Sequence, residues 1–212
     1  MKKPAPKALK KPTYVLIGFC IITIQLSIAQ LFATLTGSYD NVDWDSVGNL
    51  APLDLIAHYW WIANRIVYLF WLYRLSYNLK LLSGRWVRFT PGWTVAWYLI
   101  PIANFYKPFQ AMKEMWGLAH LRPNKVDRLV AIWWTFEVSE FLVTVIAFNI
   151  YPNTVVASER GMDLGFALAH GMTVALSVTV FMLIRRLWKS YSKNFTQREA
   201  DFLAGTNVPQ AG

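Results

Sequence analysis

The sequence predicts an all-α integral membrane bundle with four transmembrane helices and one further re-entrant or interfacial helical element. Three observations lead to this fold class. The chain of 212 residues is 55% hydrophobic and only 16% charged, whereas a soluble domain carries about 25% charged residues. Four apolar stretches are long enough to cross about 30 Å of hydrocarbon at about 1.5 Å per residue. Finally, 19 of the 21 Lys/Arg residues lie in three blocks, at 2–11, 74–128 and 185–198.

The first expected span is Thr13–Thr36, which has no charged residue. A basic leader before an apolar run could also be a secretory signal peptide, with Ser27-Ile28-Ala29 as a cleavage site. The apolar run continues to Leu35, however, which is longer than a typical signal-peptide core. We therefore expect this segment to be retained as a helix.

The other three expected spans are Leu55–Tyr73, Leu129–Ile150 and Leu164–Ile184, and the last is stopped by Arg185-Arg186. Aromatic side chains gather toward the ends of the spans, as an aromatic belt at the membrane interface would. These are Tyr59, Trp60, Trp61, Trp71, Tyr73, Trp133 and Trp134.

The segment 93–106 is apolar but too short to be a fifth span. Its 14 residues would reach only about 21 Å as a helix, and Pro101 breaks or kinks that helix. If the segment crossed, one of the later basic blocks would lie outside the cell, against the retention of basic loops in the cytoplasm. We therefore expect it to be re-entrant or interfacial.

This choice fixes the expected topology and domain organisation. Both termini and all three basic blocks are then cytoplasmic, and the outer loops 37–54 and 151–163 hold six of the twelve acidic residues. The chain divides into a basic cytoplasmic tail at 1–12, a membrane bundle at 13–186 and a C-terminal cytoplasmic tail at 187–212. The expected location is a bacterial cytoplasmic (inner) membrane.

The stretch Phe109–Leu121 places apolar residues on one helical side. It is expected to be either an amphipathic helix at the cytoplasmic surface or an ordinary helix packed on the bundle. The apolar side consists of Phe109, Met112, Met115, Trp116 and Leu118.

Three strings of residues point to a known family. They are Thr90-Pro91-Gly92-Trp93, Pro101-Ile102-Ala103-Asn104, and Lys107-Pro108-Phe109-Gln110-Ala111-Met112-Lys113-Glu114-Met115-Trp116. With Arg74, Asn78 and the pair Trp133-Trp134, they resemble the core of a bacterial integral-membrane family catalogued only as a domain of unknown function. The resemblance covers roughly residues 55–190. It implies a multi-spanning bacterial membrane protein and supplies no activity.

Three charged residues lie near the middle of their expected spans: Arg65, Glu137 and Glu140. A charge at mid-depth costs about 2.5–3.5 kcal/mol, so it normally faces the bundle and has a partner. We expect Arg65 to contact Glu137 or Glu140. The group is either an ion pair that fixes helix register or a site that responds to protons or ions or binds a polar ligand. Two acids against one arginine leave a surplus acid that could be protonated.

Five other polar residues are candidates for a ligand site. His58 and His170 could be hydrogen-bonded core residues, part of the polar site, or haem ligands, although two lone histidines on different helices are a weak haem signal. Asn104, Lys107 and Gln110 surround the tip of the re-entrant element, where broken helices often line a cavity. His58 and His170 could also be metal ligands, but no catalytic or metal site is expected, and no cofactor is expected apart from the weaker haem alternative.

The function expected from the sequence is non-enzymatic. No zinc-protease, hydrolase, nucleotide-binding or paired-cysteine motif is present, and the single Cys20 excludes an intramolecular disulfide. The net charge of +9 suits anionic lipid head groups rather than nucleic acid. We expect an accessory bundle that binds lipid or another membrane protein. The alternatives are a small ion- or proton-coupled transporter or channel and, more weakly, a haem-bearing electron carrier.

Overall fold

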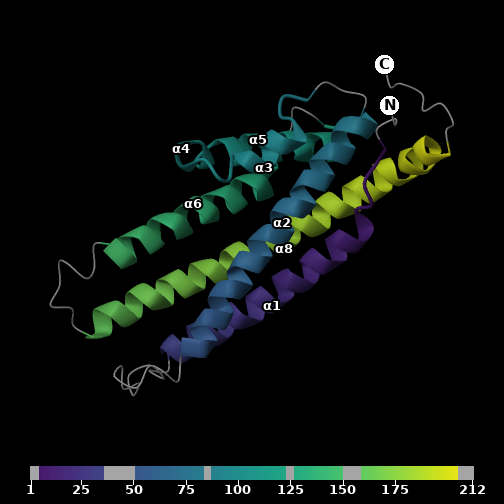
Figure 1. Cartoon of the computed structure of the whole chain (residues 1–212). Helices are drawn as coiled ribbons and strands as arrows, with labels where there is room; N and C mark the ends of the chain where they lie inside the picture. The colour runs from purple at the N-terminus through teal and green to yellow at the C-terminus, as the bar shows by residue number, and fades with distance from the viewer. Residues whose placement is uncertain (1–4, 36–50, 84–86, 123–126, 150–158, 205–212) are drawn as a thin grey trace. The chain divides into compact units, whose positions relative to one another are not determined.

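Every regular element in the described part of the computed structural model is a helix (Figure 1). The structure describes residues 5–35, 51–83, 87–122, 127–149 and 159–204, and within them leaves out the side chains of 33–34, 51–58, 144–149 and 159–166. No strand occurs in these ranges. The predicted all-α fold class is therefore confirmed.

Four long helices cover the four expected spans, except for Thr36 and Ile150, which lie outside the described residues. The helices are α1 Lys10–Leu35, α2 Ala51–Ser83, α6 Arg128–Asn149 and α8 Glu159–Leu203. Two of them, over Lys10–Phe32 and Ala167–Leu203, are long and apolar enough to cross a membrane, judged by length and composition within the described residues.

Helix α8 continues past Arg185-Arg186, the residues that stop the expected span, and ends at Leu203. These arginines end the apolar run, but arginine is a good helix former and does not break a helix. Beyond them, Leu187, Tyr191 and Phe195 follow at intervals of four residues and are all buried. That spacing keeps one side of α8 apolar and packed for two further turns.

The segment 91–119 is broken into three helices, each with a proline in its first turn: α3 Pro91–Ala96, α4 Pro101–Asn104 and α5 Lys107–Ala119. Proline is tolerated there because the first N–H groups of a helix have no intrahelical partner. Pro101 therefore breaks the helix, as the sequence predicts.

Side-chain caps fix the start of this segment. Thr90 caps α3, its hydroxyl accepting from the Trp93 N–H at 3.4 Å. The Glu114 carboxylate on α5 accepts from the N–H groups of Arg88 and Phe89, at 2.5 and 3.2 Å. The strings 90–93 and 107–116 thus belong to one local framework that joins α3 to α5.

The chain forms two compact units, and each of the four long helices contributes to both. Unit 1 comprises Met1–Ile17, Ile66–Ala131 and Met182–Gly212, and unit 2 comprises Gly18–Arg65 and Ile132–Phe181.

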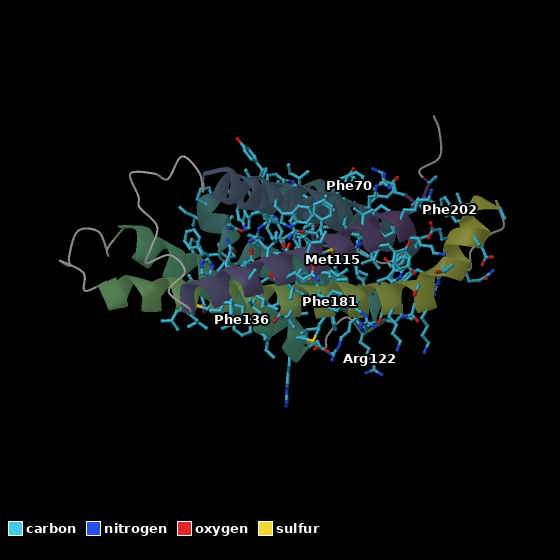
Figure 2. The ribbon with its side chains drawn as sticks, turned by 90° about the horizontal axis from the view of Figure 1, so that it is seen from below. Phe70, Met115, Arg122, Phe136, Phe181 and Phe202 are labelled. Carbon is cyan, nitrogen blue, oxygen red and sulfur yellow. The ribbon has the colours of Figure 1, made fainter. Side chains whose placement is uncertain are left out.

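Unit 1 has a dense core. Its largest fully buried side chains come from α1, α2, α5 and α8, and are Leu16, Trp71, Leu72, Leu75, Leu79, Met112, Leu183, Ile184, Leu187, Tyr191 and Phe195. In Figure 2 Met115 lies within the mass of side chains, whereas Arg122 projects at its edge. Met112, Met115, Trp116 and Leu118 are buried, which favours the second expectation for α5, a helix packed on other helices.

Unit 2 has few buried apolar side chains among its described residues. Cys20, Trp133 and Leu176 are buried, while Ile22, Phe32, Trp61, Phe141 and Leu168 are examples of large apolar side chains that lie exposed. The described residues of unit 2 thus belong to apolar helices whose side chains are mostly not covered by other described parts of the chain.

The two units differ sharply in charge. The residue ranges of unit 1 contain 19 Lys/Arg and four Asp/Glu, a net charge of +15, and those of unit 2 contain two and eight, a net charge of −6. All three basic blocks therefore fall in unit 1, and both expected outer loops fall in unit 2.

Candidate functional site

An ion pair joins α2 to α6 within unit 2. The Arg65 Nη1 atom lies 2.6 Å from the Glu137 Oε1 atom. The side chains are 32% and 15% exposed, so both charges are largely withdrawn from solvent. The Arg65 guanidinium also lies 5.3 Å from the ring centroid of Trp61. The predicted contact between Arg65 and a glutamate of α6 is therefore present.

Glu140, one turn further along α6, has a different environment. Its Oε1 atom lies 3.4 Å from the hydroxyl of Thr173 on α8. The same hydroxyl lies 3.0 Å from the carbonyl of Ala169. Because a hydroxyl has one proton, it can donate to only one of these two acceptors. The shorter contact goes to Ala169, so an ionised Glu140 would be left with a weakly satisfied oxygen.

A second polar contact in unit 2 joins α1 to α2. The Thr23 hydroxyl accepts from Trp60 Nε1 at 3.1 Å and from Asn64 Nδ2 at 3.0 Å, and it donates to the Phe19 carbonyl at 2.8 Å. The rings of Phe19 and Trp60 stack with centroids 4.5 Å apart. Of these residues only Trp60 was expected to have a role, in the aromatic belt, although a threonine in a long apolar run is a usable signal.

The predicted cluster of Asn104, Lys107 and Gln110 lies in unit 1, and no hydrogen bond joins its three side chains to one another in the described structure. The Lys107 ammonium instead faces three rings, with centroids at 5.9, 5.3 and 5.2 Å for Phe89, Trp97 and Tyr106. Two buried polar atoms nearby in the chain, Gln110 Oε1 and Trp97 Nε1, have no partner among the described residues.

The two histidines are not shown as a pair. The His170 side chain is half-buried on α8, whereas the His58 side chain lies outside the described residues. No group of three or more His, Cys, Asp or Glu that could hold a metal ion occurs in the described ranges. The haem hypothesis thus stays a prediction.

A polar centre that the sequence analysis did not assign lies in unit 1, at Asn78 of α2. This side chain is fully buried. Its Oδ1 accepts from the Lys7 N–H at 2.8 Å, and its Nδ2 donates to the Lys7 carbonyl at 2.7 Å and to the Tyr191 hydroxyl at 2.9 Å. Arg74, one turn earlier on α2, donates from Nη1 to the Ala8 carbonyl at 2.7 Å. Two side chains of α2 thus bind the backbone of the N-terminal segment.

These contacts were hard to foresee because the partners of Asn78 lie 71 and 113 positions away in the chain. The usable signal was the spacing of Arg74 and Asn78, which lie four residues apart on one side of α2.

One comparison with known proteins gives a match. The family described as "Domain of unknown function (DUF4328)" matches residues 45–189. No curated protein and no solved structure matches the chain.

Proposed function

This chain belongs to the DUF4328 family of unknown function, and we propose that it is a non-enzymatic membrane protein with four spans that binds anionic lipid or another membrane protein. The observation that carries the proposal is the lack of protein cover over its apolar helices. Only 17% of the most apolar window in Lys10–Phe32 and 28% of that in Ala167–Leu203 is buried. A helix that is apolar all round needs a protein core or a membrane around it, and the described residues of unit 2 supply little core.

The charges of the two units support an orientation. Basic segments are retained on the cytoplasmic side, and unit 1, with a net charge of +15, carries all three of them. Unit 1 would therefore face the cytoplasm and the anionic lipids of the inner leaflet. Both chain ends lie in the residue ranges of unit 1, which agrees with two cytoplasmic termini.

The contacts of α1 argue for a retained helix rather than a cleaved signal peptide. In unit 1 the Thr13 hydroxyl accepts from Trp71 Nε1 at 2.9 Å, and Leu16 is fully buried. In unit 2 Thr23 binds Trp60 and Asn64. Removal of α1 would leave these donors of α2 without their acceptors.

The broken segment 91–106 has the surface expected of an interfacial or re-entrant element. Leu99 and Ile102 are 74% and 80% exposed, and Trp93, Phe105 and Tyr106 are also exposed. Aromatic and aliphatic side chains on short helices are suited to the boundary between head groups and acyl chains.

Extraction and vesicle binding test this proposal. We expect the full chain to stay with membranes at alkaline pH and to require detergent for release. Purified protein should also bind vesicles of anionic lipid more strongly than vesicles of neutral lipid. Replacing the exposed Lys10 and Lys11 by Gln should reduce the preference of the protein for anionic over neutral vesicles. Release from membranes by alkali alone would contradict the proposal.

A second candidate function, proton-coupled transport, is favoured by the environment of Glu140. If this acid is protonated, its own O–H can donate to Thr173 while Thr173 donates to Ala169, and every group is satisfied. The Arg65 guanidinium pairs with Glu137 at 2.6 Å, and its charge also acts on Glu140. One arginine thus faces two acids, and Glu140 is the acid without the direct ion pair in the proposed site. The other ionisable groups of unit 2 with described side chains are Cys20, Tyr59, Arg65, Glu137 and His170.

The substitution Glu140→Gln tests this second function. Glutamine keeps the shape and the ability to donate to Thr173 but cannot exchange a proton. If Glu140 takes up protons, vesicles that contain the Glu140→Gln variant should show no more pH-driven quenching of a dye than protein-free vesicles do. The variant should nevertheless stay folded. Unchanged quenching in the variant would assign Glu140 to architecture instead.

A further inference from the structure

The residues before α1 form a strap, defined here as residues 5–9. They have no helical structure, and Figure 1 shows them as the extended purple segment near the yellow end of α8. The strap contacts α2 mainly through its backbone: the N–H and carbonyl of Lys7 bind Asn78, and the carbonyl of Ala8 binds Arg74. The Asn78 side-chain amide thus binds both backbone groups of Lys7, as a neighbouring strand does in a sheet. Such pairing recognises an extended backbone independently of its side chains.

Two side chains of the strap, those of Lys7 and Leu9, are recognised in addition to its backbone. The Lys7 ammonium lies 4.4 and 4.7 Å from the ring centroids of Tyr73 and Tyr77, within the range of cation–π attraction. Leu9 is 2% exposed. The strap is thus recognised as an extended segment with a lysine at one position and a buried aliphatic residue two positions later.

The far side of Asn78 is fixed by α8. The Tyr191 hydroxyl accepts from Asn78 at 2.9 Å and donates to Glu199 at 3.1 Å. With both Nδ2 protons used, the amide of Asn78 is held in the orientation that presents Oδ1 to the strap. The recognition surface, which we call the strap site, consists of Tyr73, Arg74, Tyr77, Asn78 and Tyr191.

We propose that the strap site is a peptide-binding site, that the strap is its tethered occupant, and that an extended lysine-bearing segment of a partner protein displaces it. The strap is extended up to Leu9, whose carbonyl accepts the first helical hydrogen bond of α1 from the Thr13 N–H at 3.0 Å. Release of residues 5–8 from α2 therefore requires only local unfolding. Tethering gives the strap a high effective concentration, so a partner binds well only when the strap is weakened or the partner is held nearby.

The strap and the strap site both lie in unit 1, and their contacts do not depend on the membrane placement. Peptide binding can therefore be absent while the extraction test succeeds, and the reverse.

The test uses a labelled peptide of residues 1–12 and the purified full chain in a nonionic detergent, with fluorescence anisotropy as the readout. We expect the variant Lys7→Ala/Leu9→Ala, which weakens the strap, to bind the peptide at least tenfold more tightly than the unsubstituted chain does. The matched control is Lys113→Ala/Lys193→Ala, which changes two exposed lysines outside the strap and the strap site and should leave peptide affinity unchanged.

Peptide variants test recognition without altering the protein. Against the weakened-strap chain, a peptide with Lys7→Glu or a scrambled sequence should lose at least tenfold in affinity. Introducing Tyr73→Leu/Tyr77→Leu into that chain should remove its preference for the unsubstituted peptide over a Lys7→Ala peptide. Equal affinity of the weakened and unsubstituted chains, no measurable binding, or binding that ignores the peptide sequence would overturn the proposal.

Discussion

At Arg65 and Glu137, two charges within apolar helices meet directly at 2.6 Å. Their energetic meaning lies in the coupling, because breaking one side of a buried pair leaves an uncompensated charge that typically costs about 3–5 kcal/mol, whereas removing both sides can be nearly neutral. Coupling between Arg65 and Glu137 should therefore appear as a larger loss of unfolding free energy in the single variant than in the double variant.

We predict that Arg65→Leu lowers the free energy of unfolding, and the folded yield, more than Arg65→Leu/Glu137→Leu does. Thermal unfolding in detergent and size-exclusion yield measure both quantities. The matched control is Lys80→Leu, at an exposed lysine of α2. Equal losses in the single and double variants would mean that the two groups are not coupled.

Beyond Arg186, helix α8 is a packed element of unit 1. Phe195 is fully buried, Asn194 Nδ2 donates to the Ala119 carbonyl at 2.9 Å, and Arg198 Nη1 donates to the Leu82 carbonyl at 3.3 Å. These contacts tie the end of α8 to α5 and α2.

We predict that Phe195→Ala destabilises the protein by about 3–5 kcal/mol, the usual cost of removing a buried aromatic ring. The exposed neighbour Lys193, changed to Ala, should alter the unfolding free energy by less than about 0.5 kcal/mol. Similar unfolding curves for the two variants would show that the end of α8 does not pack in solution.

The end of α5 is strained at Leu121, which has φ of 55°. The N–H groups of Arg122 and Leu121 close the helix on the carbonyls of Gly117 and Leu118, at 2.8 and 3.1 Å, and this turn usually carries glycine at the left-handed position. We predict that Leu121→Gly raises stability by about 0.5–1 kcal/mol. It relieves about 1–2 kcal/mol of backbone strain and loses about 0.5–1 kcal/mol to the greater freedom of the unfolded chain. Chemical denaturation measures the change, and a loss of stability would contradict the prediction.

The elements that the sequence could predict are those fixed by local rules. Apolar length placed the four long helices, proline placed the break at 101, and the cost of a lone charge required a partner for Arg65. The continuation of α8 past Arg185-Arg186 was missed because charge ends a membrane span but not a helix. The strap site was missed because Asn78 binds a backbone 71 residues away, and backbone partners leave no pattern in a sequence.

For the whole molecule, charge and burial divide the chain in the same way. Unit 1 is basic and has a dense core, while unit 2 is acidic, apolar and little buried among its described residues. A chain with a cytoplasmic part and a lipid-embedded part has this division, because only the first can rely on the hydrophobic effect of water for its core.

Cysteine accessibility is the most direct test of the proposal that unit 1 faces the cytoplasm and that unit 2 is embedded in lipid. Single cysteines at positions 45, 85, 125 and 155 are introduced in a chain whose Cys20 is replaced by Ala, and intact cells are treated with a thiol reagent that does not cross the membrane. We predict labelling at 45 and 155, and labelling at 85 and 125 only after the cells are opened. Labelling of position 125 in intact cells would contradict the four-span topology, because it would place the middle basic block outside.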